Sequence, residues 1–162
     1  MTQTTHNPFF FRYNTPFDTP PFNEIKTEHY EPAFDQAIEE AKQEIKTIST
    51  SAEAPDFENT IVALDKSGGI LARVSGVFFA LTEADTNDSL TALNEKMAPV
   101  LSEHSDNIYL NQDLYKRVAD VHQQEKEGKI TLTTEQHRLL DKYYKAFVRS
   151  GAGLEMPENN PV

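Results

Sequence analysis

The sequence contains no cysteine among its 162 residues. This absence excludes disulfide bonds, thiolate zinc sites and a cysteine nucleophile, and it leaves the redox compartment undetermined. No apolar run approaches the roughly 20 residues that a membrane-spanning helix needs. The start of the chain, MTQTTHNPFFF, lacks the basic and apolar regions of a signal peptide. We therefore expect a cytoplasmic protein, or a periplasmic or exported one if a leader has been removed.

Basic residues are scarce beside acidic ones, with 15 Lys and Arg against 26 Asp and Glu and a net charge of −11. A protein that binds nucleic-acid phosphates needs a basic face, and anionic membranes attract basic segments. The composition therefore predicts no nucleic-acid partner and no membrane partner. The length suffices for one domain with a core, because a chain of this size buries roughly 70% of its unfolded surface.

Motifs for metal binding are also missing. No two histidines have the four-residue spacing of HExxH; the five are His6, His29, His104, His122 and His137. His122 with Glu125, and His137 with Asp141, have the spacing of one helix face. We interpret each as a surface pair, because neither has a visible third metal ligand.

Motifs for nucleophilic catalysis and cofactor binding are absent in the same way. Ser67, which precedes Gly68 and Gly69, belongs to no GxSxG motif and to no phosphate-binding glycine loop. The GAG sequence at 151–153 follows a predicted helix rather than a strand, which is the wrong context for a dinucleotide. We therefore predict no catalytic, metal-binding or cofactor-binding residue in this chain.

What the sequence does contain is helical periodicity, most clearly from Phe57 to Leu81. Apolar or small residues recur there at steps of three and four: Phe57, Ile61, Leu64, Gly68, Leu71, Val74, Phe78 and Leu81. This spacing predicts one central helix, with Asp56 as its N-cap and Asn59 reaching back to it.

Small residues form a second face of that helix, at Gly69, Ala72 and Gly76. Glycine inside a helix costs roughly 1 kcal/mol relative to alanine. We interpret Gly68 and Gly69 as the place where a crossing helix approaches closely, with a kink as the alternative.

Two further helices lie on either side of the central one. The first is predicted to begin between Thr27 and Pro32, with an apolar stripe at Phe34, Ala37, Ile38, Ala41, Ile45 and Ile48. The third should begin at the polar cluster 86–89, and Pro99 should bend it. Its stripe is formed by Leu90, Leu93, Met97, Val100, Leu101 and Ile108.

The last two helices have recognisable ends. The fourth is predicted to begin at the N-cap Asn111 and to stop at Gly128. The fifth is predicted to begin at a capping box of Thr133 and Gln136 and to end at Gly151. Its apolar and aromatic surface is wide and consists of Leu139, Leu140, Tyr143, Tyr144, Phe147 and Val148.

The N-terminal segment is rich in proline and phenylalanine, and its prolines at positions 8, 16, 20 and 21 forbid a regular helix. We expect an extended arm held on the helical body by Phe9, Phe10, Phe11, Phe17 and Phe22. The chain should thus be all-α, an array of about five helices in antiparallel hairpins. The expected domains are the arm at 1–24, the helical domain at 25–151 and a tail at 152–162.

Several segments resemble one known family. TPPFNEIKTEHYEPAFDQAI, FENTIVALDKSGGILARVSGVFF, NQDLYKRVADV and LTTEQHRLLDKYYKAFVRSGAGL are similar to the N-terminal region of the thimet oligopeptidase and peptidyl-dipeptidase family of zinc metallopeptidases. The segments follow the family's order over nearly the whole chain. NPFF and TPPFNEIKTEHYEPAF look closest to the bacterial peptidyl-dipeptidase branch.

The resemblance implies hydrolysis of short peptides by zinc, held by the histidines of HExxH and a later glutamate, with the motif's glutamate activating water. Those residues would lie hundreds of positions beyond Val162, so none can be assigned here, and zinc is expected in the parent enzyme only. The chain is then expected to be an N-terminal fragment, inactive alone, that forms part of a substrate-channel wall. Its partners would be the remainder of the parent enzyme and, as the parent's substrates, short peptides.

Two further expectations follow. Apolar surface meant for the missing part should be exposed, so we expect self-association through the region 143–148. The alternative function is a stand-alone acidic helical module for protein interaction. An HExxH motif in the reading frame beyond Val162 would favour the peptidase, and a natural stop there would favour the module.

Overall fold

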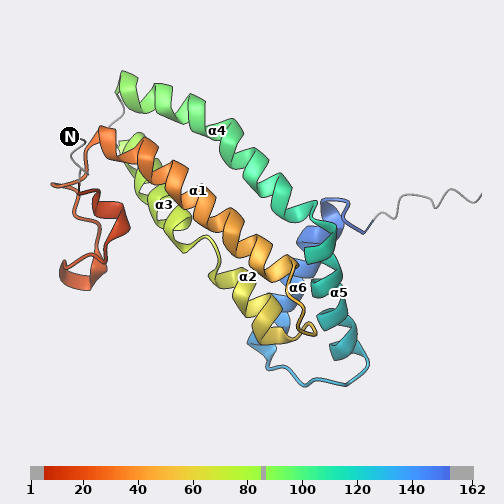
Figure 1. Ribbon diagram of the computed structural model, residues 1–162. Coiled ribbons are helices and arrows are strands. Elements are labelled where there is room, and N and C mark those ends of the chain that lie inside the picture. The colour runs from red at the N-terminus through yellow and green to blue at the C-terminus, as the bar shows by residue number, and fades with distance from the viewer. Residues whose placement is uncertain (1–5, 85–86, 154–162) are drawn as a thin grey trace, which may run out of the picture. The chain divides into compact units, whose positions relative to one another are not determined.

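The computed structural model describes residues 6–84 and 87–153, and that part of the chain contains helices and turns but no strand (Figure 1). The α-helices are α1 (Thr27–Ser49), α2 (Ala63–Lys66), α3 (Gly69–Ala84), α4 (Asp88–Tyr109), α5 (Gln112–Lys126) and α6 (Thr134–Arg149). The shorter helices are η1 (Pro8–Phe10), η2 (Pro16–Asp18) and η3 (Phe57–Val62). The all-α fold class is confirmed. No helix of the described residues is both long and apolar enough to cross a bilayer.

The described residues divide into two compact units. The first comprises 6–43, 68–84 and 87–101, and the second comprises 44–67 and 102–153. Each unit has its own apolar core. The domain boundaries expected near residues 24 and 151 stay predictions.

The predicted apolar stripe of α1 is confirmed, because all six of its residues are buried. Phe34 and Ile38 belong to the core of the first unit, which is rich in aromatic rings. Ile45 and Ile48, closer to the end of α1, belong to the core of the second unit. The start of α1 at Thr27 also agrees with the prediction.

The prediction of a single central helix from Phe57 to Leu81 is wrong. The segment is divided into η3 and α2 before Ser67, whose ψ of 151° is extended, and α3 after Gly68, whose φ is +69°. A positive φ is strained for any residue with a side chain but not for glycine, so Gly68 ends one helix and admits the next. The predicted stripe is therefore shared between cores: Ile61 packs in the second unit and Phe78 in the first.

Close approach of a helix at the glycines, our preferred interpretation, is wrong for the residues that the structure describes. A Cβ atom added at Gly69 or Gly76 would meet nothing within 4 Å, and one at Gly68 would lie 3.8 Å from the Cβ of Ala41, an ordinary contact. The backbone instead supports the alternative interpretation, a kink. Of the two glycines, Gly68 is the one that adopts the positive φ at this break.

Alanine substitutions distinguish a glycine that is needed for its positive φ, Gly68, from a glycine at an open helical position, Gly76. Gly68→Ala is expected to lower the free energy of unfolding by about 1–2 kcal/mol, because it forces a side chain into the left-handed region. Gly76→Ala in the isolated chain should raise it by up to about 1 kcal/mol, since the site is helical and open. Urea unfolding followed by circular dichroism measures both. Equal effects of the two substitutions would contradict this assignment.

The predicted cap at Asp56 is confirmed, and it is one part of a larger network in the second unit. The Asp56 carboxylate accepts from the backbone N–H of Asn59 at 2.7 Å, and the Asn59 Oδ1 accepts from the N–H of Asp56 at 2.9 Å. The same Oδ1 also accepts from Thr60 Oγ1 at 2.8 Å and from Arg117 Nη2 at 3.0 Å. The FENT segment is thus held by a buried arginine of α5.

The ends of α5 and α6 agree with the prediction. Asn111 caps α5, and Thr133 with Gln136 forms the capping box of α6. Gly128 and Gly151, which follow the two helices, have φ of 70° and 89°, the conformation that terminates helices.

The aromatic surface of α6 is largely covered inside the second unit. Tyr143 and Phe147 are buried, whereas Val148 is 45% exposed. The Tyr143 hydroxyl donates to Asp65 Oδ1 at 2.8 Å, and burial followed by this hydrogen bond raises the pKa of Tyr143. Self-association through this region stays a prediction, with less apolar surface to support it than expected.

Helix α4 continues through Pro99. The bend predicted there stays a prediction. Leu90, Leu93 and Met97 are buried as expected, but Val100 is 37% exposed.

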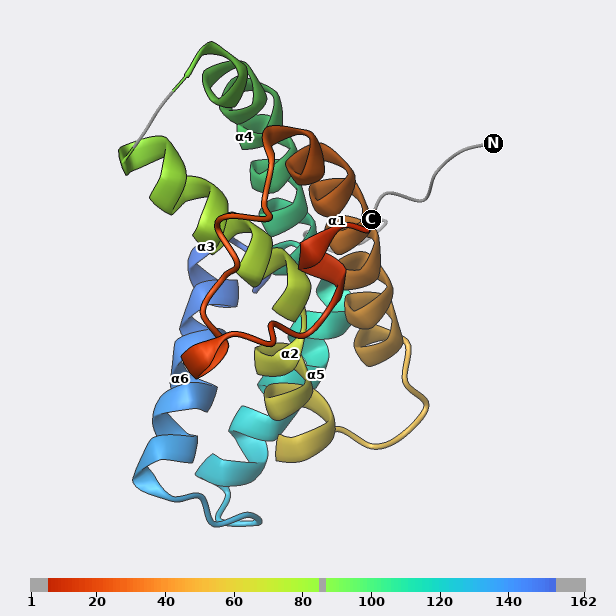
Figure 2. The same ribbon diagram turned by 90° about the vertical axis from the view of Figure 1, so that its left-hand side faces the viewer.

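The arm packs on α3, as the contact of η1 with that helix shows (Figure 2). Phe9 is fully buried, and its ring lies 5.3 Å from that of Tyr30. The expectation that all five phenylalanines hold the arm is wrong for three of them, since Phe11 is 50%, Phe17 99% and Phe22 52% exposed. The prolines keep the arm extended, so it forms no regular helix that could pack one face on the body. Many of its side chains therefore remain in solvent.

Candidate functional site

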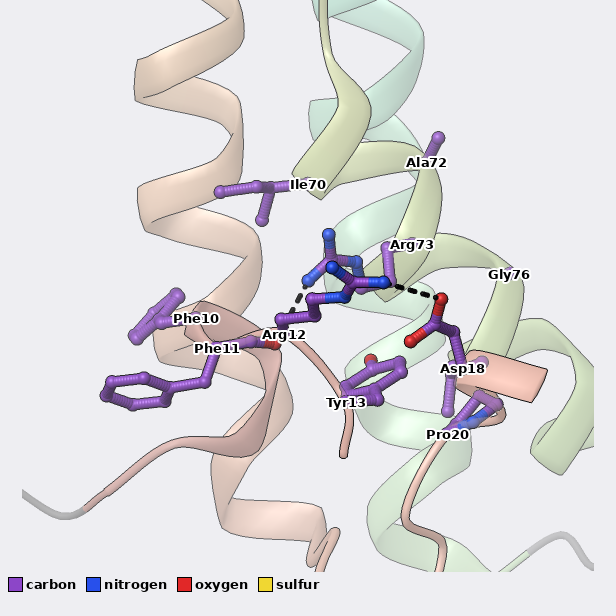
Figure 3. Close-up of a pocket in the computed structure, with 11 residues that line it drawn as sticks. Phe10, Phe11, Arg12, Tyr13, Asp18, Pro20, Ile70, Ala72, Arg73 and Gly76 are labelled. Atoms are coloured by element: carbon purple, nitrogen blue, oxygen red, sulfur yellow. Dashed lines mark hydrogen bonds and ion pairs between the residues drawn. The ribbon is translucent and has the colours of Figure 1, made fainter. Parts of the chain in front are cut away.

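A groove of about 750 Å³ lies in the first unit between the arm and α3 (Figure 3). The arm supplies residues between Phe10 and Pro20, and α3 supplies residues between Ile70 and Val77. The walls are mostly apolar, and the polar side chains are two arginines, a tyrosine and an aspartate. The described lining contains no histidine and no serine.

Arg73 connects the two walls. Its Nη1 donates to the carbonyl oxygens of Phe9 at 3.3 Å and Phe11 at 3.2 Å, which have no helical partner in the open arm. Its guanidinium also lies over the Tyr13 ring, 5.3 Å from the centroid, a cation–π contact (Figure 3). A single side chain of α3 therefore helps to hold this part of the arm, together with the buried Phe9 ring and the hydrogen bond from Asn7 to the His29 carbonyl.

The far end of the groove is less constrained. Arg12 forms an ion pair with Asp18 at 3.4 Å, and both side chains are largely exposed, so the pair contributes little stability. Phe17 and Asp18 have φ of 61° and 53°, a region that residues with side chains adopt rarely. This turn presents the Phe17 ring to solvent rather than to the body.

Tyr13, which lines the groove, and Tyr30, which contacts the Phe9 ring, are not suited to proton transfer at neutral pH. Burial raises the pKa of Tyr13, although Arg73 opposes the shift, and burial raises the pKa of Tyr30 to about 12. Both hydroxyls are therefore protonated near neutral pH. Within the described residues neither hydroxyl has a hydrogen-bond partner. The groove can contact a polypeptide through apolar and cationic groups, but it holds no paired acid and base for hydrolysis.

The histidines paired by spacing have further partners that the spacing did not predict. His137 Nδ1 lies 2.9 Å from Glu125 Oε1, which joins α6 to α5. His122 stacks on the Tyr144 ring with centroids 3.8 Å apart. Across residues 6–84 and 87–153, no group of three or more His, Cys, Asp or Glu side chains could hold a metal ion. The side chains described therefore do not fit a zinc site.

His122 should make the stability of the second unit depend on pH. Its pKa is lowered chiefly by burial and next by Lys126, while the carboxylates of Glu125 and Asp141 oppose the shift. Because the folded pKa lies below the ordinary value of about 6.5, the unfolded chain binds the proton more readily. Stability should therefore be full above that value and decline as the pH falls below it.

The variant His122→Gln isolates this contribution. Between pH 7.5 and 5.5, the urea midpoint should fall more in the unaltered protein than in the variant. The readout is the difference in slope, because the loss of the Tyr144 stack shifts both ends of the variant's curve together. Parallel curves would refute the assignment.

The serine and glycine motifs set aside in the sequence have structural roles. Ser67 Oγ donates to the Leu64 carbonyl at 2.7 Å, at the end of α2. Gly151 terminates α6, and a Cβ at Gly153 would lie 2.9 Å from the Tyr115 hydroxyl.

Two arginines were not recognised from the sequence. Arg117 is on the same face of α5 as Leu114, Val118 and Val121, all buried, so a charge inside an apolar stripe was a usable signal. Arg73 is the one charged residue between Ile70 and Leu81, which is a comparable signal.

Comparison with protein-family models finds no match. Among curated proteins, the chain is 42% identical over 151 residues to the dipeptidyl carboxypeptidase of Escherichia coli strain K12, which covers 93% of this chain and 22% of that protein. It is 43% identical over 148 residues to the same enzyme of Salmonella typhimurium, covering 91% and 22%. It is 28% identical over 140 residues to oligopeptidase A of E. coli, covering 86% and 20%.

These matches confirm the resemblance: the chain is a sequence relative of the thimet oligopeptidase family of peptidases. Within that family, its identity is higher to the two dipeptidyl carboxypeptidases than to oligopeptidase A. The chain spans about a fifth of the length of these relatives and corresponds to their N-terminal part.

Proposed function

We propose that this chain forms the N-terminal helical region of a peptidase that hydrolyses short peptides, and that it contributes part of the wall of the substrate channel. The observation that carries the proposal is the match of 93% of the chain to 22% of a dipeptidyl carboxypeptidase. The zinc of such an enzyme would be bound by residues outside the matched segment. The role of the chain would then be to shape the access of peptides to the catalytic part.

The absence of a paired acid and base in the groove fits this division of labour. The described residues also gather no set of metal ligands. A helical region of this kind acts by excluding large substrates and by packing on the catalytic part. Its contribution would appear in KM and in the length of peptide accepted, rather than in the chemical step.

A chimera tests the proposal. In the E. coli dipeptidyl carboxypeptidase, the matched segment is replaced by this whole chain, and release of dipeptides from short peptides is measured. We expect an active, chelator-sensitive chimera, and no turnover by this chain alone with zinc added. Chelator-sensitive turnover by the chain alone would place the machinery within it and overturn the proposal.

An inactive chimera has a separate meaning. If the chain within it is folded by circular dichroism and the chimera is still inactive, the chain does not serve as this enzyme's N-terminal region. The stand-alone interaction module is then favoured.

A further inference from the structure

The outward face of α3 is unlike the solvent face of a helix. Its exposed residues include five apolar or small ones whose spacing places them on one side: Gly69, Ala72, Gly76, Phe79 and Ala80. The only charged side chains exposed with them are Arg73 and Glu83. A surface helix normally presents charged and polar residues to water.

Helix α1, which belongs in large part to the same unit, shows the ordinary pattern. Its exposed residues include Glu28, Glu31, Asp35, Glu39 and Lys42. The contrast matters because the chain as a whole is strongly charged, at −11. A helix face with few charged residues is therefore a local property of α3 and not a consequence of composition.

The glycines on this face serve no packing purpose in the described chain. A Cβ at Gly69 or Gly76 would meet nothing within 4 Å. Gly76, in the interior of α3, still weakens the helix by roughly 1 kcal/mol relative to alanine. Glycine is expected where another backbone comes close, and the described fold brings none to these two positions.

Exposed aromatic rings are present on α3 and on the arm. Phe79 is 40% exposed on α3 itself, and Phe11 is 50% exposed on the arm. Phe11 and Gly76 both line the groove between the arm and α3, so the apolar surface continues from the helix into the groove (Figure 3). Contiguous exposed apolar surface of this kind marks an interaction site.

We propose that this surface, called the α3 face and defined by Ala72, Gly76, Phe79 and the adjoining groove, is where the rest of the peptidase packs. The inference rests on the proposed function, because the occupant is the part of the enzyme beyond the matched segment. The matched segment is only 22% of the dipeptidyl carboxypeptidase, so a large further part of the protein accompanies this region in that relative. Apolar and small residues outnumber the charged ones on this face and in the groove, which fits a mainly apolar protein surface.

Two glutamate substitutions and a matched control test the α3 face. Gly76→Glu and Phe79→Glu place a charge on it. Ala92→Glu places the same charge on α4 of the same unit, where the side chain is also exposed. In the isolated chain all three variants should fold, because residue 76 has open space and Phe79 and Ala92 already contact solvent.

The same variants are then placed in the chimera with the E. coli enzyme. Gly76→Glu and Phe79→Glu should reduce the yield of active enzyme at least tenfold, and Ala92→Glu should leave it within twofold. Equal activity of the three variants overturns the inference while the active parent chimera preserves the proposed function. An inactive parent chimera overturns both.

Sedimentation of the isolated chain tests whether a second copy of the chain, rather than the rest of the peptidase, occupies the α3 face. We expect a monomer, or an association that Gly76→Glu leaves unchanged. A dimer that dissociates on Gly76→Glu but not on Ala92→Glu would assign the face to a second copy of the chain and overturn the proposed occupant.

Discussion

Replacing Arg117 with methionine is expected to lower the free energy of unfolding by about 3–5 kcal/mol. Arg117 is 6% exposed. Its Nη1 donates to the carbonyls of Ser51 at 3.2 Å and Glu53 at 2.9 Å, and its Nη2 donates to Asn59 Oδ1 at 3.0 Å. Each bond from a charged donor contributes about 1.5–3 kcal/mol, and the two carbonyls would lose their guanidinium donor in a partly buried place. Asn59 Oδ1 would keep its bonds from Asp56 and Thr60.

The consequence should extend to the start of η3. The segment 50–56 has no regular structure, and Arg117 holds two of its carbonyls. Hydrogen exchange should therefore show the largest loss of protection in the FENT segment and in α5. Chemical denaturation measures the total effect.

Two comparisons make this expectation specific. Arg138→Met removes an exposed arginine from α6 and should change stability by less than about 0.5 kcal/mol. Asn59→Ala combined with Arg117→Met should cost less than the sum of the single changes, because both residues belong to one network. A loss below about 1 kcal/mol for Arg117→Met would mean that water replaces the guanidinium without penalty.

Truncation of Phe78 to alanine should have an effect of similar size in the first unit, about 3–5 kcal/mol. Phe78 has no exposed surface, and its ring meets Tyr30 and Phe34 edge-on, with centroids 5.2 and 5.4 Å apart. The cavity left by the ring cannot close easily, because its neighbours are rigid aromatic rings on α1. Edge-on aromatic contacts add about 0.5–1.5 kcal/mol beyond the burial of area.

Hydrogen exchange is the appropriate measurement for this variant, since a chain with two cores need not unfold in a single step. Protection should fall in α3 and in the first half of α1. The control is Phe17→Ala, which removes a ring that is 99% exposed and should leave stability unchanged. If Phe17→Ala is as costly as Phe78→Ala, the arm packs more closely than the structure describes.

Helix ends were the part of the fold that the sequence predicted best. The caps at Asp56, Asn111 and Thr133 are all present, with the side chains named in advance. A cap joins residues two or three positions apart, so the information for it is local. The same reasoning accounts for Gly128 and Gly151, whose conformation depends on the absence of a side chain at one position.

The division of the segment 57–81 was not predicted, and the reason is geometric. Leu64 and Leu71 are about two helical turns apart, so their spacing is compatible with one continuous helix. The break at Ser67 and Gly68 leaves this period intact while the two halves pack in different cores. Periodicity reports that a face is buried and does not report what buries it.

The candidate groove and the Arg117 network depend on contacts between distant parts of the chain. Arg73 reaches carbonyls 64 and 62 positions away, and Arg117 reaches acceptors 66, 64 and 58 positions away. Neither contact is encoded by a local pattern, although each arginine interrupts an apolar stretch. Likewise, the spacing of His137 suggested Asp141, while the folded chain pairs it with Glu125.

By itself, the sequence determined the helical class, the caps and the kinship with peptidases, because each depends on residues close in the chain or on their order. Only the tertiary structure decided that the long periodic segment is two helices, that Gly68 is the glycine with a conformational role, and that Gly69 and Gly76 lie on an open face. These properties depend on which surfaces meet, and burial is a relation between distant residues. Of the glycine pair that suggested a crossing helix, Gly68 lies at the break between α2 and α3, and Gly69 lies at the edge of the proposed docking surface.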